Sequence, residues 1–172
     1  IDCSIDAVGP MFEYMRSNGV FTWSQMEATC DKLTKYKRDN SSWFNFQINS
    51  SYQLLNYNNT LEFVNFVQDH EADSNIRLVV FPEHLRAGNL PLSFKKEAYT
   101  MCDKIELRYG RKYPHQIKTL DDIRKALSVE EPYLDNFKKI ITEQDKFRGT
   151  YLYNYNEQLA ELVYGPAQLC LL

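Results

Sequence analysis

The stretch LRYGRKYPHQIK, from Leu107 to Lys118, carries the densest binding chemistry in the chain. It mixes cationic and aromatic side chains and contains no acid. Cations neutralise phosphates and aromatic rings stack on unpaired bases, so this mixture is typical of surfaces that bind single-stranded nucleic acid. An acidic protein partner would meet the same charges. The candidate binding residues are Arg108, Arg111, Lys112, Tyr113, His115 and Lys118.

A structural explanation accounts for the same stretch. An apolar stripe that begins near Phe94 predicts a helix ending at Gly110, so Arg108 would lie in its last turn and complement the helix dipole. Arg111 to Lys118 would then be a solvated bend before the next helix, for which Thr119 is the expected cap.

A second basic run follows a predicted helix near the N-terminus. Thr22 and Gln25 have the spacing of a capping box, and the helix that they start ends in Lys32, Lys35, Lys37 and Arg38. The preceding short helix and glycine turn also suggest a helix–turn–helix. However, the expected outer face offers Glu27 where groove recognition needs Arg or Lys, which favours a plain helical hairpin. A polyanion site would require Lys35, Lys37 and Arg38 to share a face with the Arg108–Lys118 stretch.

Three alternating tyrosines form another candidate surface. In TYLYNYNEQL, the alternation of Tyr151, Tyr153 and Tyr155 would put three rings on one side and Leu152 on the other. Exposed tyrosines are frequent anchors in protein interfaces. The alternative is a short edge strand or a helix lead-in packed on the core.

Acidic and histidine side chains flank a predicted strand. Asp69, His70, Glu71 and Asp73 precede it, and Glu83 and His84 follow it. Carboxylates with a histidine could hold Mg²⁺ or Mn²⁺ for a nuclease-like hydrolase. Their spacing matches no metal motif, and polar loops at both strand ends explain them equally. The sequence contains no GxSxG, HExxH or phosphate-binding glycine motif, so no catalytic residue is assigned.

The elements that must position these groups are mainly helical. Alternating Phe44, Phe46 and Ile48 predict a strand over residues 43–48, and the apolar run Ile76–Phe81 predicts a strand buried on both faces. Helical periodicity dominates from Ser93 onward, and its last long helix is expected to turn Phe147 inward before Gly149. We therefore expect an α+β fold, predominantly helical, with about six to eight helices and a two- or three-stranded sheet.

Composition supports one domain spanning residues 1–172, and the missing initiator Met suggests excision from a larger protein. The net charge of −3 and pI near 5.7 argue against a dedicated nucleic-acid-binding domain, and no apolar run is long enough to span a bilayer. Four scattered cysteines favour free thiols inside the cell. Three glycosylation sequons, at Asn40, Asn49 and Asn58, leave a secreted glycoprotein with two disulfides as the alternative.

Together these features predict a non-enzymatic protein–protein interaction or self-association domain of a larger intracellular protein, either cytoplasmic or nuclear. It would need no cofactor or metal and would not bind a membrane. The first alternative is an RNA- or DNA-binding domain that uses the basic and aromatic residues. The second is the metal-dependent hydrolase.

Overall fold

A small parallel sheet runs through the centre of the protein. The computed structural model describes residues 1–17, 20–40, 43–110 and 114–165, with the backbone alone for residues 17 and 114–117. Strands β1 (Asp2–Ser4), β2 (Gln47–Tyr52) and β3 (Asp73–Leu78) lie side by side in this order, and all run in the same direction. The predicted class, a mainly helical α+β fold, is confirmed.

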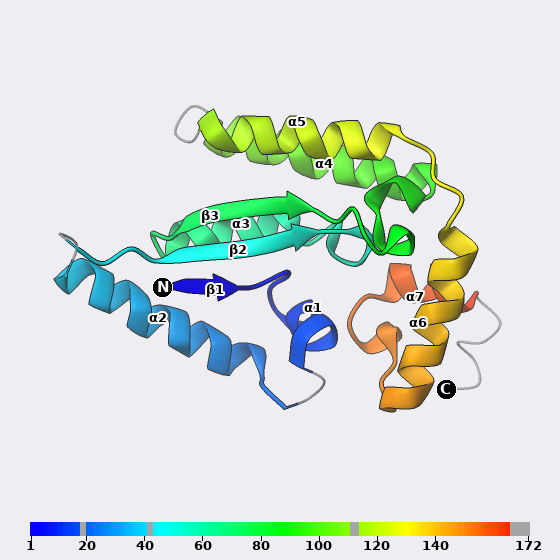
Figure 1. Cartoon of the computed structure of the whole chain (residues 1–172), viewed down its shortest axis with the longest axis horizontal. Helices are drawn as coiled ribbons and strands as arrows, with labels where there is room; N and C mark the ends of the chain where they lie inside the picture. The colour runs from blue at the N-terminus through cyan, green and yellow to red at the C-terminus, as the bar shows by residue number, and fades with distance from the viewer. Residues whose placement is uncertain (18–19, 41–42, 111–113, 166–172) are drawn as a thin grey trace.

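Seven α-helices surround the sheet in the described part of the chain (Figure 1). In this view α2 runs along the side of β1, α3 lies behind β2 and β3, and α4 and α5 lie beyond β3. Helices α6 and α7 lie at the end toward which the strands point. The helices are α1 (Pro10–Phe12, continued by a π-helical turn at Glu13–Ser17), α2 (Trp23–Asp39), α3 (Thr60–Asp69), α4 (Leu92–Tyr109), α5 (Pro114–Ser128), α6 (Leu134–Arg148) and α7 (Glu157–Tyr164). Short 3₁₀ turns occur at Leu54–Asn56, Glu83–Leu85, Ala87–Asn89 and Leu152–Asn154.

Local hydrogen bonds set several helix ends as the sequence predicts. The Gln25 backbone N–H donates to Thr22 Oγ1 at 3.3 Å, and the Thr22 N–H donates to Gln25 Oε1 at 2.9 Å, which completes the capping box. Gly149 ends α6 in the left-handed conformation, with φ of 65°. The expected cap at Thr119 is wrong, because α5 already begins at Pro114 and Thr119 lies inside it.

Strand β2 keeps the predicted alternation but lies further along the chain. It begins at Gln47, and the buried face continues from Phe46 and Ile48 through Ser50 and Tyr52. Ser50 and Tyr52 carry hydroxyls, so the apolar pattern in the sequence ended before the strand did. This shift puts Tyr52 at the last position of the central strand.

The expectation that Ile76–Phe81 is a strand buried on both faces is wrong. Strand β3 ends at Leu78, and Val80 and Phe81 are 67% and 79% exposed. Because β3 is an edge strand, one of its long sides has no neighbouring strand, and Ile76 and Leu78 are only partly buried. The apolar run therefore continues beyond the sheet onto the surface.

The face through which helix α6 packs on the core does not include Phe147. Phe137, Ile141 and Asp145 are buried at four-residue spacing, whereas Phe147 is 92% exposed. Two residues beyond Asp145 correspond to about 200° around the helix axis, so Phe147 points away from the core. The inward placement predicted for Phe147 is wrong.

The buried carboxylate of Asp145 joins α6 to the rest of the molecule. It accepts hydrogen bonds from the Tyr14 hydroxyl at 2.8 Å, from the Leu152 backbone N–H at 2.8 Å, and from the Tyr164 hydroxyl. Tyr14 belongs to the turn after α1, and Tyr164 ends α7. Burial, with Asp145 as the second cause, raises the pKa of Tyr14. One carboxylate on α6 thus connects the N-terminal turn after α1 with the turn after α6 and the end of α7.

One of the three sequons begins within β2, and another begins in the turn before α3. Asn49 is in the middle of β2, and Asn58 accepts a hydrogen bond from the Asn156 side chain at 3.3 Å. The third begins at Asn40 and continues into residues 41–42, which lie outside the described ranges. No helix in the described part of the chain is long and apolar enough to cross a membrane.

Three cysteines are free thiols, and Cys170 lies outside the described residues. Cys30 and Cys102 are fully buried, and burial is the main cause that raises their pKa, to about 12 and about 11. Cys3 is half-buried and close enough to Cys30 for a hydrogen bond between their side chains. If the chain forms a disulfide among these three, the pair is therefore Cys3 with Cys30.

We expect Asp145→Ala to lower the free energy of unfolding by about 3 kcal/mol, because three buried donors lose their acceptor. Urea unfolding followed by circular dichroism measures this. Glu143→Ala, on the exposed side of α6, is the control and should change stability by less than about 0.5 kcal/mol. Equal effects of the two substitutions would contradict the role of Asp145.

We expect iodoacetamide to alkylate Cys30 and Cys102 on the order of 100-fold more slowly in the native protein than in urea. A raised pKa leaves less thiolate at neutral pH, and burial blocks access. Peptide mass mapping at pH 7.5 measures each rate, and the half-buried Cys3 serves as the internal comparison. Rapid native alkylation of Cys102 would show that the α4 packing is wrong.

Candidate functional site

An exposed aromatic cluster lies where α2 leads toward β2. The rings of Tyr36, Trp43 and Phe44 pack edge to face, with centroids 5.9 Å apart for Tyr36–Trp43, 4.9 Å for Tyr36–Phe44 and 6.1 Å for Trp43–Phe44. Trp43 is nevertheless 68% exposed. Backbone N–H groups of Trp43 and Phe44 bond to the Asn40 carbonyl at 3.3 and 3.1 Å and hold the segment against the end of α2. We call this cluster the aromatic tip.

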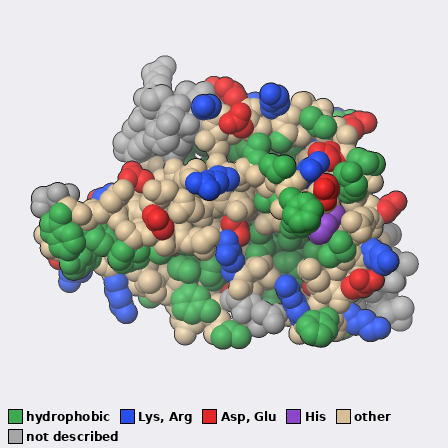
Figure 2. Space-filling model, in the orientation of Figure 1, with side chains coloured by type: hydrophobic (Ala, Val, Ile, Leu, Met, Phe, Trp, Pro, Cys, Tyr) green, Lys and Arg blue, Asp and Glu red, His purple; other side chains and the backbone are tan. Residues whose placement is uncertain are grey.

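The aromatic tip borders an open groove with basic neighbours. The groove has a volume of about 780 Å³ and is lined by the three rings together with Lys32 and Leu33. Figure 2 shows hydrophobic side chains gathered at this end of the molecule, with Lys and Arg side chains below them. Lys32 and Lys35 are both exposed on α2. The surface can therefore offer flat apolar area and positive charge together.

Two other basic residues predicted on α2, Lys37 and Arg38, bind Glu71 within the protein. Arg38 forms an ion pair with Glu71, its Nε lying 3.0 Å from Glu71 Oε1, and Lys37 donates to the Glu71 carbonyl. The hydrogen bond from Arg38 is the main cause that lowers the pKa of Glu71. Of the predicted binding residues in this run, Lys35 is exposed and precedes Tyr36 of the aromatic tip in the sequence.

Arg108 and Lys118, the residues of the second predicted basic surface whose side chains the structure describes, lie on α4 and α5 and not on α2. Helices α2 and α4–α5 lie on opposite sides of the sheet in Figure 1. Arg108 lies over the Tyr109 ring, 5.2 Å from its centroid, and Lys118 is exposed on α5. Arg111, Lys112 and Tyr113 lie outside the described residues, as does the side chain of His115. Nearby, Arg124 pairs with Asp103, Glu106 and Asp121, so acidic groups interrupt the positive charge.

The three alternating tyrosines do not form one surface. Leu152–Asn154 is a 3₁₀ turn, and Leu152 is fully buried as expected. Tyr151 and Tyr153 are each 42% exposed, but the Tyr155 ring packs against Tyr14, with centroids 5.2 Å apart. The prediction that all three rings share one side is wrong, because the turn rotates Tyr155 toward the core.

The two halves of the proposed metal cluster lie at opposite ends of β3. Asp73 begins this strand and Glu83 follows its far end, and six strand residues span about 17 Å. His70 is buried, and its ring nitrogens contact the Phe66 carbonyl at 2.8 Å and Asp31 Oδ1 at 3.2 Å. No group of three or more potential ligands forms within the ranges that the structure describes. The strand therefore separates the residues that the sequence suggested would meet.

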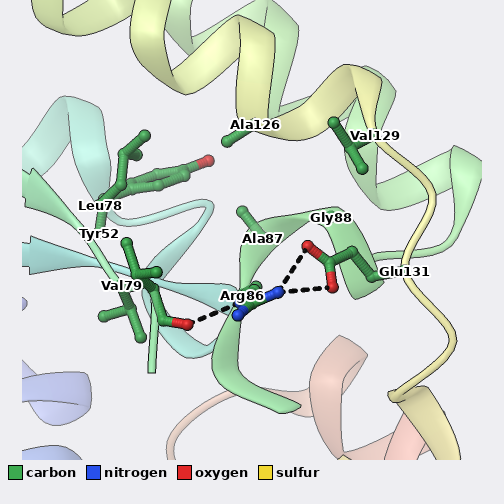
Figure 3. Close-up of a pocket in the computed structure, with 10 residues that line it drawn as sticks. Tyr52, Leu78, Val79, Arg86, Ala87, Gly88, Ala126, Val129 and Glu131 are labelled. Carbon is green, nitrogen blue, oxygen red and sulfur yellow. Dashed lines mark hydrogen bonds and ion pairs between the residues drawn. The ribbon is translucent and has the colours of Figure 1, made fainter. Parts of the chain in front are cut away.

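A separate pocket lies at the carboxyl ends of β2 and β3 (Figure 3). It has a volume of about 270 Å³, and its walls are mainly the apolar residues Leu78, Val79, Val80, Ala87, Ala126 and Val129. Ligands of open α/β folds commonly bind beyond the carboxyl ends of parallel strands, where the loops that follow them diverge. Here the loop after β3 and the end of α5 form the two sides of that space.

An ion pair lies at the rim of this pocket. Arg86 Nη1 lies 3.2 Å from Glu131 Oε2, and Arg86 Nε donates to the Val80 carbonyl at 2.7 Å (Figure 3). Behind it, the buried Lys95 donates to the Val129 carbonyl at 2.7 Å and ties α4 to the end of α5. The cationic groups around the pocket thus already have acceptors within the protein.

Tyr52 lines the pocket, but its hydroxyl is buried in the protein beside it. Tyr52 is 3% exposed, and its hydroxyl has no hydrogen-bond partner in the described part of the chain. Figure 3 shows this hydroxyl pointing toward Ala126 and α5. Burial is the main cause that raises the pKa of Tyr52.

Sequence reasoning missed both the aromatic tip and this pocket. Trp43 and Phe44 were interpreted as the start of a strand, and Tyr52 followed a run of polar residues without a distinctive motif. The pocket also needs Ala126 and Glu131, which are far from Tyr52 in the chain. No local pattern could have indicated that these residues meet.

Comparisons with models of known protein families, with curated proteins and with solved structures found no significant match for this chain.

We expect Gly88→Ala to lower the free energy of unfolding by about 1–3 kcal/mol. A Cβ atom at this position would lie 2.8 Å from Glu131 Cγ and 3.1 Å from the Val129 carbonyl oxygen. Glu131→Ala removes the closest of these atoms, so the double variant should lose less stability than the sum of the two single variants. Strict additivity in urea unfolding would contradict the close approach of the two pocket walls.

Proposed function

We propose that this chain is a non-enzymatic binding domain that holds a protein partner at the aromatic tip. The observation that carries the proposal is the Trp43 ring, which is 68% exposed although Tyr36 and Phe44 pack against it. The partner would contribute an apolar side chain to the groove and acidic residues beside it.

An exposed and fixed tryptophan favours binding for two reasons. Tryptophan and tyrosine are the residues most enriched among interface positions that dominate binding energy. Rings that already pack on each other lose little conformational freedom when a partner covers them. The groove beside Trp43 supplies the concave surface that an anchor side chain needs.

The charge around the tip favours an acidic protein segment over a nucleic acid. Lys32 lines the groove and Lys35 is exposed on the same helix, but Arg38 pairs with Glu71, and the acidic Asp31 and Asp39 also lie on α2. A nucleic acid needs a continuous cationic path along its backbone. Two lysines beside an apolar groove instead match a peptide with an apolar anchor and nearby carboxylates.

A displayed peptide library selected on the wild-type chain tests this proposal. Enriched peptides should combine a large apolar residue with Asp or Glu, and fluorescence anisotropy then measures the affinity of one of them. We expect Trp43→Ala to weaken it about 30-fold or more, as for an interface hot spot. Reversing Lys32 and Lys35 to Glu should mainly slow association and reduce its salt dependence.

Phe147→Ala is the matched control, because Phe147 is an exposed aromatic residue on α6, a different helix. It should leave peptide affinity unchanged. Peptides that bind wild type and Trp43→Ala equally well would contradict the proposal. Salt-sensitive binding of single-stranded RNA that is lost with the lysine reversals would favour the nucleic-acid alternative. Sedimentation of the chain alone, with dimers lost in Trp43→Ala, would identify the partner as a second copy.

A further inference from the structure

An exposed apolar segment lies at the end of the sheet opposite the aromatic tip. Val80 and Phe81 follow β3 and are 67% and 79% exposed. Trp43 precedes β2, so the parallel strands place the tip and this segment at opposite ends of the sheet. Two adjacent large apolar side chains in water are a candidate contact surface for another protein. We call residues Val80–Glu83 the anchor segment.

Hydrogen bonds hold the backbone on both sides of the Phe81 ring. Arg86 Nε donates to the Val80 carbonyl at 2.7 Å, and the Leu85 backbone N–H donates to the Pro82 carbonyl at 3.1 Å. A ring on a fixed backbone loses less conformational freedom on binding than a ring on an unrestrained loop. The anchor segment can therefore enter a preformed groove without first being ordered.

The charges beside the anchor segment complement those beside the aromatic tip. Arg86 lies between two carboxylates, with Nη2 3.9 Å from Glu83 Oε1 and Nη1 3.2 Å from Glu131 Oε2 (Figure 3). These three groups together carry a net negative charge, whereas Lys32 lines the groove of the tip. An apolar side chain with acidic neighbours is the partner proposed for that groove, so the chain itself carries both complementary surfaces.

Strand β3 separates the anchor segment from the groove of the same copy. Its six residues span about 17 Å, and Phe81 lies beyond the far end of the strand. The groove, with a volume of about 780 Å³, is larger than the roughly 150 Å³ of an apolar cavity that holds one benzene ring, so a phenylalanine side chain fits it. The phenylalanine that fills the groove must therefore come from another copy.

We propose that the anchor segment of one copy docks in the groove of the aromatic tip of a second copy, an inference that rests on the proposed function of the tip. Phe81 inserts beside Trp43, and Glu83 lies toward Lys32. The two surfaces differ, so the contact is heterologous, and a dimer keeps one free groove and one free anchor segment. Wild-type chains therefore associate head to tail beyond the dimer.

Two variants that each remove one surface test this proposal on the full chain. Trp43→Ala disables the groove, and Phe81→Ala removes the anchor. Both side chains are exposed, so both variants should fold as wild type does, which circular dichroism checks. Light scattering and sedimentation velocity over a concentration series measure the mass. We expect the wild-type mass to rise past that of a dimer, and each variant to self-associate about 30-fold or more weakly.

An equimolar mixture of the two variants separates a head-to-tail contact from a symmetric one. The anchor of the Trp43→Ala chain can enter the intact groove of the Phe81→Ala chain, but no second contact can follow. The mixture should therefore form heterodimers with the affinity of the wild-type contact and nothing larger. Phe147→Ala, which removes an exposed aromatic ring on α6, is the matched control and should associate as wild type does.

Dimers that persist in Phe81→Ala alone would indicate a symmetric contact between two tips and overturn the proposal. A wild-type chain that stays monomeric at every concentration would also overturn it. In that case, displayed peptides that bind wild type but not Trp43→Ala would leave the proposed function of the tip intact. Peptides that bind both chains equally well would remove that function together with the head-to-tail contact.

Discussion

The common direction of the three strands is the constraint on which the rest of the structure depends. Parallel neighbours need long crossover connections, which α2 supplies between β1 and β2 and α3 supplies between β2 and β3. Segments that precede a strand therefore lie at the amino ends of the strands, and segments that follow a strand lie at their carboxyl ends. Trp43 and Phe44 lie near the amino end of β2, and Tyr52 and Leu78 lie at the carboxyl ends of β2 and β3. The common strand direction thus separates the aromatic tip from the pocket at the carboxyl ends of β2 and β3.

Buried carboxylates secure the elements that such a small sheet cannot hold by itself. Asp6 follows β1 and accepts hydrogen bonds from the Ser51 backbone N–H and from Arg16, both at 2.8 Å. Asp145 performs the same role for the C-terminal helices through Tyr14 and Tyr164. A carboxylate has two oxygens and can accept several hydrogen bonds, so one side chain connects several segments. Both acids belong to the fold, which removes them from the set of candidate catalytic groups.

Ion pairs within the protein engage several of its arginines. Several guanidinium groups have acidic partners on neighbouring elements, and Lys95 is buried against a backbone carbonyl. A guanidinium group binds a carboxylate through more than one N–H, and this geometry suits contacts between elements. The remaining charge beside the aromatic tip comes mainly from Lys32 and Lys35. The paired arginines are Arg16 with Asp6, Arg38 with Glu71, Arg86 with Glu131, and Arg124 with Asp103 and Glu106.

The sequence by itself determined the local features of this protein: the α+β class, most of the helices, the Thr22 capping box and the helix end at Gly149. These depend on hydrogen bonds and periodicity within a few residues, so they are readable without knowledge of the rest of the chain. Only the tertiary structure decided that the sheet is parallel, that Trp43 is exposed and that Tyr52 faces a pocket. Each of these depends on segments brought together from distant parts of the chain. The exposure of a side chain and the pairing of a strand depend on these long-range contacts, so they cannot be predicted from the residue type alone.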